Sequence, residues 1–310
     1  MDIKVENLTK IYGTEKAVDS ISFNVKPGEI LGFLGPNGAG KSTTMKIITC
    51  FMAPNSGDVK IGGHSINNNS KDIKRKIGYL PENNPLYLDM PVLEYLSFVA
   101  ELQGVEKDKI QEKLVEMVML CGLEEEKHKK IGELSKGYRQ RVGLAQAMIH
   151  DPEILILDEP TSGLDPNQII EIRKLIKELG RHKTVILSTH ILPEVEATCD
   201  RILIINKGKI VADGTSESLR KQAQGGGFIK IKIDGEQDTD KLFSSLMDLE
   251  TVSKVDPSKE DKYVFNVTGG DGLTTQKEIF KLCVKKKWTL LEMTPVETKL
   301  EDIFKELTTN

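Results

Sequence analysis

Residues Gly35 to Thr43 read GPNGAGKST and match the spacing G-x-x-x-x-G-K-[ST] of a phosphate-binding loop. The loop follows a run typical of a buried strand and precedes a helix that we expect to begin at Lys41. Backbone N–H groups of such a loop surround a phosphate, and the positive end of the helix dipole adds to the attraction. We expect Lys41 to reach the β- and γ-phosphates of ATP, and Ser42 to ligate Mg²⁺. The residues predicted to bind the nucleotide here are Gly35, Pro36, Asn37, Gly38, Ala39, Gly40, Lys41, Ser42 and Thr43.

Two adjacent carboxylates follow the apolar run ILIL. Asp158 ends a predicted buried strand, Glu159 comes next, and the chain turns at Pro160. Successive strand residues point in opposite directions, but the turn lets both carboxylates address one site. We predict that Asp158 ligates Mg²⁺ and that Glu159 is the general base for an attacking water. The alternative is that these carboxylates only cap the next element.

The surrounding elements predict an α/β nucleotide-binding core. Alternating residues in IKVENLT and SISFNVKPGEILGFLG indicate antiparallel strands that lead into a buried strand. The continuous apolar runs EILILDEP and KTVILSTH are typical of parallel strands that are covered on both faces. Helical spacing over residues 92–120, between the phosphate loop and EILILDEP, predicts a helical insertion.

The second half of the chain predicts a separate small domain. RILIINKGKIVADG indicates a hairpin that turns at Lys207 and Gly208, and residues 221–227 have the composition of a linker. Beyond it we expect an α+β domain of βαββαβ order over residues 228–310, followed by a short terminal helix. The predicted organisation is therefore a nucleotide-binding domain at 1–220, a linker at 221–227 and an accessory domain at 228–310.

The composition argues against nucleic acid as a partner. The 310 residues include 43 basic and 47 acidic side chains, so a net charge of −4 gives no overall positive field. Cys50, Cys121, Cys199 and Cys283 form no C-x-x-C pair, which suits a reduced compartment. The start has no secretory apolar run, and no later run approaches the ~20 residues that span a bilayer. We expect a soluble, cytoplasmic chain.

Four further landmarks show what the first 220 residues resemble. Tyr12 lies in TKIYG, the stretch LSKGYRQR contains Ser135 and Gly137, Asp165 lies in TSGLDP, and His190 ends LSTH. With the phosphate loop and the carboxylates, they follow the order found in the ATP-binding subunits of ABC transporters, and this part of the chain resembles that family. A lone tyrosine or histidine is otherwise most often a core or surface residue.

The resemblance implies a fold, a partner and a role for each landmark. The implied fold is the ABC type of the P-loop NTPase fold, with a mixed sheet core, an antiparallel β subdomain and a helical insertion. Tyr12 would stack on adenine, and His190 would contact the γ-phosphate. Ser135 and Gly137 of the signature and Asp165 of the D-loop would act across a homodimer that encloses ATP. Dimer closure would drive integral membrane permease subunits, which would hold the chain on the inner face of the cell membrane.

Three positions depart from the commonest family pattern. Glu82 in IGYLPENNP replaces a glutamine, and we expect it to contact Mg²⁺ or its water and to couple the site to the membrane partner. In the signature, Lys136 replaces a glycine and Tyr138 replaces a glutamine. We expect an altered but working signature, because the helix start still suits an anion.

Apolar residues between two prolines leave two interpretations open. They are Leu86, Tyr87, Leu88 and Met90, in a stretch where a continuous helix is not expected. Either they pack under the helical insertion, or they form a groove for a helix of the membrane subunit.

A narrower resemblance concerns the kind of transporter. This chain resembles the gliding-motility-associated ATP-binding subunits, members of the ABC-2 exporter ATPases, in LPENNPLYLDMPVLEYL, LSKGYRQRVGLAQA, TSGLDPNQIIEIRKLIKELG and LSTHILPEVEATCDRILIINKGKIVADG. The terminal VETKLEDIFKELT resembles the tail of the ABC-2 group in general. Drug, polysaccharide or sodium export are alternatives within this group. A soluble ABC ATPase that acts on ribosomes or DNA is a further alternative, disfavoured because the chain has one cassette and a mildly acidic charge. For the accessory domain we expect a role in homodimerisation or regulation.

Overall fold

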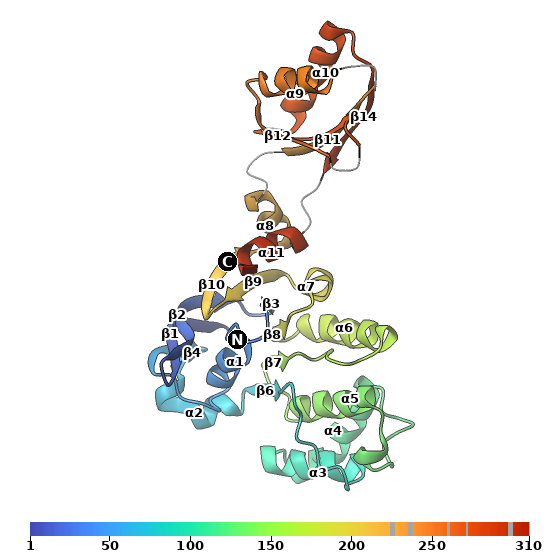
Figure 1. Cartoon of the computed structure of the whole chain (residues 1–310). Coiled ribbons are helices and arrows are strands. Elements are labelled where there is room, and N and C mark those ends of the chain that lie inside the picture. Colours follow the sequence, from blue (N-terminus) through green and yellow to red (C-terminus); the bar gives the residue numbers. More distant parts are fainter. Residues whose placement is uncertain (224–226, 235–237, 259–260, 271, 297–299, 310) are drawn as a thin grey trace. The chain divides into compact units, whose positions relative to one another are not determined.

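The computed structural model describes residues 1–223, 227–234, 238–258, 261–270, 272–296 and 300–309. The chain forms two compact units. The first contains Met1–Thr215 and the residues from Leu307 onward, and the second contains Ser216–Glu306 (Figure 1).

A six-stranded, mainly parallel sheet forms the centre of the first unit. Its order is β10-β9-β3-β8-β7-β6, with only β10 antiparallel to its neighbour. Every residue of β3, β7 and β8 is buried, as expected for strands covered on both faces. The parallel strands and the β9–β10 hairpin predicted from the sequence are thus confirmed. The strands are β3 (Ile30–Leu34), β6 (Ile77–Leu80), β7 (Ile154–Asp158), β8 (Thr184–Thr189), β9 (Arg201–Asn206) and β10 (Lys209–Gly214).

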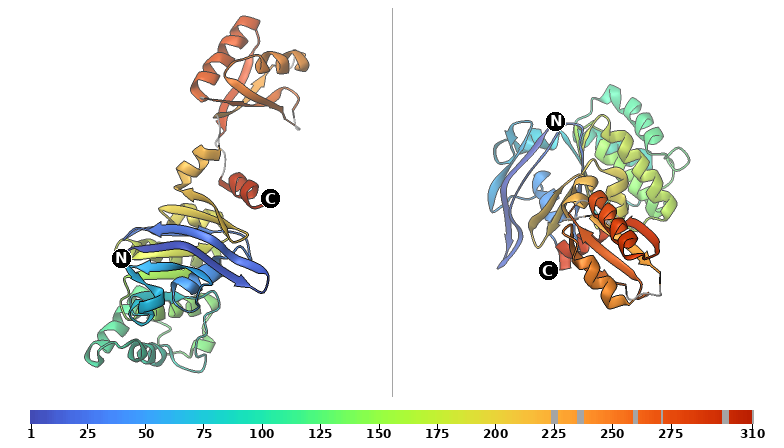
Figure 2. Two further views of the ribbon diagram at one scale, coloured as in Figure 1. Left: turned by 90° about the vertical axis from the view of Figure 1, so that its left-hand side faces the viewer. Right: turned by 90° about the horizontal axis from the view of Figure 1, so that it is seen from above.

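An antiparallel sheet of order β2-β1-β4-β5 lies beside the central sheet (Figure 2). Its inward side chains share one apolar core with α1 and with the central strands, because alternate residues of β1 and β2 point to that side. This is the expected antiparallel subdomain. Its elements are β1 (Ile3–Tyr12), β2 (Glu15–Val25), α1 (Lys41–Ile48), β4 (Ser56–Ile61), β5 (His64–Ser65) and α2 (Ile66–Lys74).

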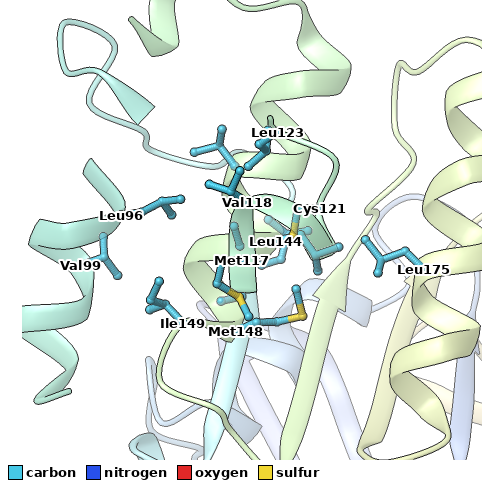
Figure 3. Close-up of a cluster of buried hydrophobic side chains, with 14 of the residues drawn as sticks. Leu96, Val99, Met117, Val118, Cys121, Leu123, Leu144, Met148, Ile149 and Leu175 are labelled. Atoms are coloured by element: carbon cyan, nitrogen blue, oxygen red, sulfur yellow. The ribbon is translucent and has the colours of Figure 1, made fainter. Parts of the chain in front are cut away.

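The expected helical insertion consists of two helices that pack against a third. The first helix ends at Gly104, whose φ of 80° suits a residue without a side chain. Leu96, Val118 and Leu144 contribute to the buried cluster that holds the helices together (Figure 3). The elements are α3 (Val92–Gln103), α4 (Lys107–Leu120), the 3₁₀ turn η1 (Ile131–Glu133) and α5 (Lys136–Met148). Two further helices, α6 (Pro166–Gly180) and α7 (Leu192–Thr198), complete the unit.

The second unit has the predicted βαββαβ order. Its sheet order, β12-β13-β11-β14, is antiparallel throughout, which makes it a split βαβ arrangement. Helices α9 and α10 share one apolar core with the sheet and therefore cover the same face. The elements are α8 (Ser216–Ala223), β11 (Gly227–Ile233), α9 (Thr239–Met247), β12 (Val252–Pro257), β13 (Val264–Gly269), α10 (Gly272–Lys286), β14 (Leu290–Val296) and the part of α11 (Leu300–Thr309) before Leu307. No helix in the described parts of the chain is long and apolar enough to cross a membrane.

The boundary between the units differs from the expected linker at 221–227. The first unit already ends at Thr215, and α8 begins at Ser216 and continues to Ala223. Leucine, arginine, lysine, glutamine and alanine in this stretch all favour a helix, which explains why residues 221–223 are helical. Residues 224–226 lie outside the described residues, and Gly227 belongs to β11.

The end of the chain also departs from the expected domain at 228–310. Residues from Leu307 belong to the first unit, where the carbonyl of Leu307 accepts a hydrogen bond of 3.1 Å from Asn206 Nδ2. Sequence patterns describe local structure and do not reveal such a return contact.

Replacing Leu155 by alanine should destabilise the first unit. Leu155 is fully buried in β7, so the change removes apolar contacts and leaves a cavity, at about 2–5 kcal/mol of unfolding free energy. The matched control Leu102→Ala alters an exposed leucine of α3 and should stay within about 0.5 kcal/mol. Urea unfolding of both variants measures the difference, and equal losses would contradict the buried position of β7.

Candidate functional site

The candidate site lies at the carboxyl edge of the central sheet. Strands β3, β8, β7 and β6 are adjacent and parallel, so their carboxyl ends meet at one edge. The phosphate loop follows β3, Glu82 follows β6, Asp158 ends β7 and His190 follows β8. These segments surround a cavity of about 500 Å³. It is lined by Ala17, Pro36, Asn37, Gly38, Ala39, Gly40, Lys41, Ser42, Thr43, Glu82, Glu159, Ser162 and His190.

The phosphate loop curls tightly against β2. Gly38 and Gly40 have φ of 78° and 108°, in the region that favours glycine. A Cβ atom at Gly40 would lie 2.3 Å from the carbonyl oxygen of Ala17, so no side chain fits there. The N–H groups of the first turn of α1 have no partners within the helix and can bind phosphate oxygens.

The ammonium of Lys41 is buried within this loop. The side chain is 6% exposed, and Nζ donates hydrogen bonds to the carbonyl oxygens of Gly35 (2.7 Å) and Pro36 (3.2 Å). Nζ also lies 3.5 Å from Glu159 Oε1. A triphosphate in the cavity would compete with Glu159 for the same cation, so the geometry suits a lysine that binds phosphate.

Asp158 and Glu159 are held in place by Ser188 of β8. Ser188 Oγ donates a hydrogen bond of 2.5 Å to Asp158 Oδ1, and the N–H of Glu159 donates to Ser188 Oγ at 3.1 Å. Glu159 has a φ of 50°, so the chain turns sharply where the strand ends. The Glu159 carboxylate accepts a 2.9 Å hydrogen bond from Nδ1 of His190 when that nitrogen carries the proton. Both carboxylates are buried, and each has a defined partner.

Ser188 was not identified from the sequence. The signal was present in the run KTVILSTH, because parallel pairing of two predicted strands can set a serine opposite the aspartate. The observed register pairs Asp158 with Ser188. The choice of register, however, depends on the tertiary structure.

The oxygen groups near Ser42 fit a magnesium site that is completed by phosphate. Ser42, Glu82 and Asp158 line a second cavity of about 390 Å³, together with Tyr79. Burial raises the pKa of Tyr79, and the negative charges of Asp158 and Glu82 raise it further. Among the described residues, no cluster of three His, Cys, Asp or Glu side chains could hold a metal alone. Mg²⁺ commonly binds through one or two carboxylates plus substrate phosphates, which agrees with this arrangement.

Tyr12 lies at the end of β1 and does not line the main cavity. Its ring is 47% exposed, its hydroxyl donates to Met52 Sδ at 2.9 Å, and Lys10 Nζ lies 5.7 Å from the ring centre. Ala17 of β2 lines the cavity instead, and no sequence pattern points to it. Stacking of Tyr12 on adenine therefore stays a prediction.

Ser135, Gly137 and Asp165 meet at a different part of the first unit. Ser135 Oγ caps α5 by accepting a 3.4 Å hydrogen bond from the N–H of Tyr138, and Asp165 caps α6 in the same way. Gly137 packs against the side chain of Gln168, which a Cβ atom at Gly137 would approach to 2.5 Å. The starts of α5 and α6 are therefore in contact, and these residues do not line the cavity of their own chain.

The two unusual signature residues have partners within the chain. Lys136 Nζ lies against Gly163, where a Cβ atom would come within 2.0 Å of it. The Tyr138 ring packs on the core and has the Arg141 guanidinium 5.8 Å from its centre. Both side chains thus fit the local packing of α5.

A buried carboxylate that sequence reasoning missed connects the loop after β7 with the end of β8. Glu194 Oε2 accepts hydrogen bonds from the hydroxyls of Thr161 (2.8 Å) and Thr189 (3.0 Å). Thr161 follows the Asp158–Glu159 pair, and Thr189 precedes His190. Glu194 is therefore in a position to hold the loop after β7 against the end of β8.

Comparisons with known proteins agree with this geometry. The chain matches the protein-family model described as ABC transporter over residues 18–162. It is 35% identical over 305 residues to the uncharacterized ABC transporter ATP-binding protein YxlF of Bacillus subtilis (strain 168), covering 97% of this chain and 98% of the relative. It is 36% identical over 307 residues to the bacitracin transport ATP-binding protein BcrA of Bacillus licheniformis, a match that covers 98% of this chain and 96% of the relative. Among solved structures, the chain is similar to the dimeric post-hydrolysis state of the ATP-binding cassette MJ0796 bound to ADP and Pi. The TM-score is 0.64 at 28% sequence identity, and the match covers 69% of this chain and 98% of that structure's chain.

A phosphate loop at the carboxyl edge of such a sheet is that of a P-loop ATPase. Since relatives at 35% and 36% identity match over almost the full length, the chain belongs to the ATP-binding subunits of ABC transporters. It is accordingly an ATPase that uses ATP with Mg²⁺.

Replacing Glu194 by alanine should weaken both the fold and ATP hydrolysis. The hydroxyls of Thr161 and Thr189 would stay buried without their acceptor, at about 1–3 kcal/mol of unfolding free energy. The control is Glu178→Ala, which removes an exposed glutamate of α6 and should stay within about 0.5 kcal/mol. Thermal unfolding and ATPase rates test both variants. Similar losses in the two would show that the effect does not come from the hydrogen bonds of Thr161 and Thr189, and would contradict the proposed link.

Proposed function

We propose that this chain is the ATP-hydrolysing subunit of an ABC-2 type exporter, and that two copies enclose ATP between them. The observation that carries the proposal is the separation of two sets of residues within one chain. The phosphate loop and its carboxylates line the cavity, whereas Ser135, Gly137 and Asp165 lie at another part of the unit. A second copy would bring its signature to the cavity of the first, and the pair would be isologous.

Hydrolysis would depend on a rearrangement of buried charges. The γ-phosphate would replace Glu159 as the partner of the Lys41 ammonium, which lies 3.5 Å from the Glu159 carboxylate. Glu159 would then be available to accept a proton from the attacking water, and His190 would keep its carboxylate oriented. Ser42, Asp158 and phosphate oxygens would hold Mg²⁺, and Glu82 would contact the metal or its water. The ion would neutralise charge on the phosphates. ADP and phosphate leave fewer contacts across the dimer than ATP does, so the dimer would open.

The membrane partner would dock beside the helical insertion. Leu86 and Met90 pack against the core, but Tyr87 and Leu88 are exposed. The Tyr87 ring lies 5.8 Å from the ring of Phe98, which extends the apolar surface on α3. Leu86 and Met90 thus fit the packing interpretation, and the exposed pair is suited to a helix from the permease. Through that contact the chain would sit peripherally on the inner face of the cell membrane.

The proposal specifies export as the direction of transport and names no particular cargo. The relative BcrA is named for bacitracin transport, which supports a drug-type exporter. Neither of the two relatives described above is named for gliding motility, so that assignment stays a prediction from sequence resemblance. A net charge of −4 gives no support to a ribosome- or DNA-directed ATPase.

Mixing two inactive variants should restore part of the ATPase activity if the site is shared. Lys41→Ala removes the phosphate-binding lysine, and Ser135→Arg blocks the signature, so each homodimer should be inactive. A mixed dimer has one intact site, formed by Lys41 of one copy and Ser135 of the other. Random exchange makes half of the dimers mixed, so the mixture should recover up to about a quarter of wild-type activity. Activity of Ser135→Arg alone, or no recovery on mixing, would contradict the shared site.

Replacing Glu82 by alanine should reduce the response to Mg²⁺. The carboxylate lines both cavities beside Ser42, so its loss should raise the Mg²⁺ concentration needed for half-maximal ATPase about tenfold. The control Glu101→Ala removes an exposed glutamate of α3 and should leave the response unchanged. An unaltered Mg²⁺ response in Glu82→Ala would rule out the proposed role at the metal.

A further inference from the structure

One face of α10 in the second unit exposes large apolar side chains. Leu273, Phe280 and Val284 are 67%, 54% and 63% exposed. Their spacing of seven and four residues aligns them in one stripe along the helix. The buried side of α10 is formed by other residues, among them Ile279 and Cys283. The stripe is therefore not part of the core of the unit.

A row of lysines runs along one flank of this stripe. Lys277, Lys281 and Lys285 are exposed and follow one another at intervals of four residues. Lys286 and Lys287 add two exposed positive charges at the end of the helix. None of these five lysines forms an ion pair within the described part of the chain.

Three lysines on the sheet of the same unit do have acidic partners. On the sheet, Lys230, Lys232 and Lys254 each have a carboxylate oxygen within 4.0 Å. The one acidic residue of α10, Glu278, accepts a 2.7 Å hydrogen bond from Thr251. The positive charge beside the stripe is thus local and not neutralised, although the whole chain carries a net charge of −4.

We propose that the face of α10 formed by Leu273, Lys277, Phe280, Lys281, Val284 and Lys285 binds the surface of a bilayer that contains anionic lipids. The apolar stripe enters the boundary between headgroups and acyl chains, and the lysines stay at the headgroup phosphates. The inference concerns the second unit and does not rest on the proposed function.

The size of the stripe favours a bilayer over a protein partner. From Leu273 to Val284 the helix rises by about 16 Å, and a helix is about 10 Å wide. The face therefore offers on the order of 150 Å². A specific protein interface takes about 800 Å² from each partner. A lipid surface has no such requirement, because apolar burial and electrostatic attraction add up residue by residue.

Sedimentation of the full-length protein with lipid vesicles tests the proposal. The protein should bind vesicles of phosphatidylcholine and phosphatidylglycerol in equal amounts, more weakly as salt is added, and should not bind phosphatidylcholine alone. The triple variant Lys277→Gln, Lys281→Gln, Lys285→Gln should bind about a hundredfold more weakly, because each lysine contributes roughly a fivefold increase in vesicle affinity. The control triple Lys230→Gln, Lys232→Gln, Lys254→Gln removes the same charge from the sheet and should bind like wild type. Equal binding by the two triples would overturn the proposal.

The apolar part of the face is tested separately. Phe280→Ser combined with Val284→Ser should weaken vesicle binding, whereas Leu291→Ser, at an exposed leucine of β14, should not. If instead the wild-type chain self-associates, the double variant does not, and vesicle binding is the same in both, the face is a protein interface and the lipid proposal is wrong. ATPase rates measured without vesicles should be unchanged in every variant, which keeps this test apart from that of the ATP site.

Discussion

The parallel pairing of β7 with β8 is the constraint on which the site depends. It sets Asp158 opposite Ser188, whose hydroxyl bonds to the aspartate and to the N–H of Glu159. Since parallel strands end at the same edge, His190 after β8 comes within 2.9 Å of the Glu159 carboxylate. A pairing shifted by one residue would turn these side chains to opposite faces and dismantle the site.

Buried charges at this edge are stable only because they compensate one another. Lys41 and Glu159 are each 6% exposed and lie 3.5 Å apart, and His190 supplies a further partner to the carboxylate. A buried ion pair contributes little net stability, but loss of one partner leaves an uncompensated charge. Such an arrangement is suited to a site in which an incoming phosphate replaces one of the partners.

Much of the fold and of the site could be predicted because the signals are local. Strands covered on both faces appear as apolar runs, and the phosphate loop has glycines that backbone geometry requires, as the φ of 108° at Gly40 demonstrates. Ser188 and Glu194 were missed because a serine or a glutamate in isolation has no distinctive neighbours. The linker was misjudged because composition at 221–227 does not reveal where helix α8 ends.

The sequence by itself determined the order of the elements, the phosphate loop and the identity of the chemical groups at the site. These features arise from residues that are close together along the chain. Only the tertiary structure decided that Gly137 lies against the start of α6, and that Ser135 and Gly137 lie away from the cavity of their own chain. It also decided that the lysines of α10 border an exposed apolar stripe. The physical reason is that strand register and helix packing bring together residues far apart in sequence, and no local pattern encodes those distances.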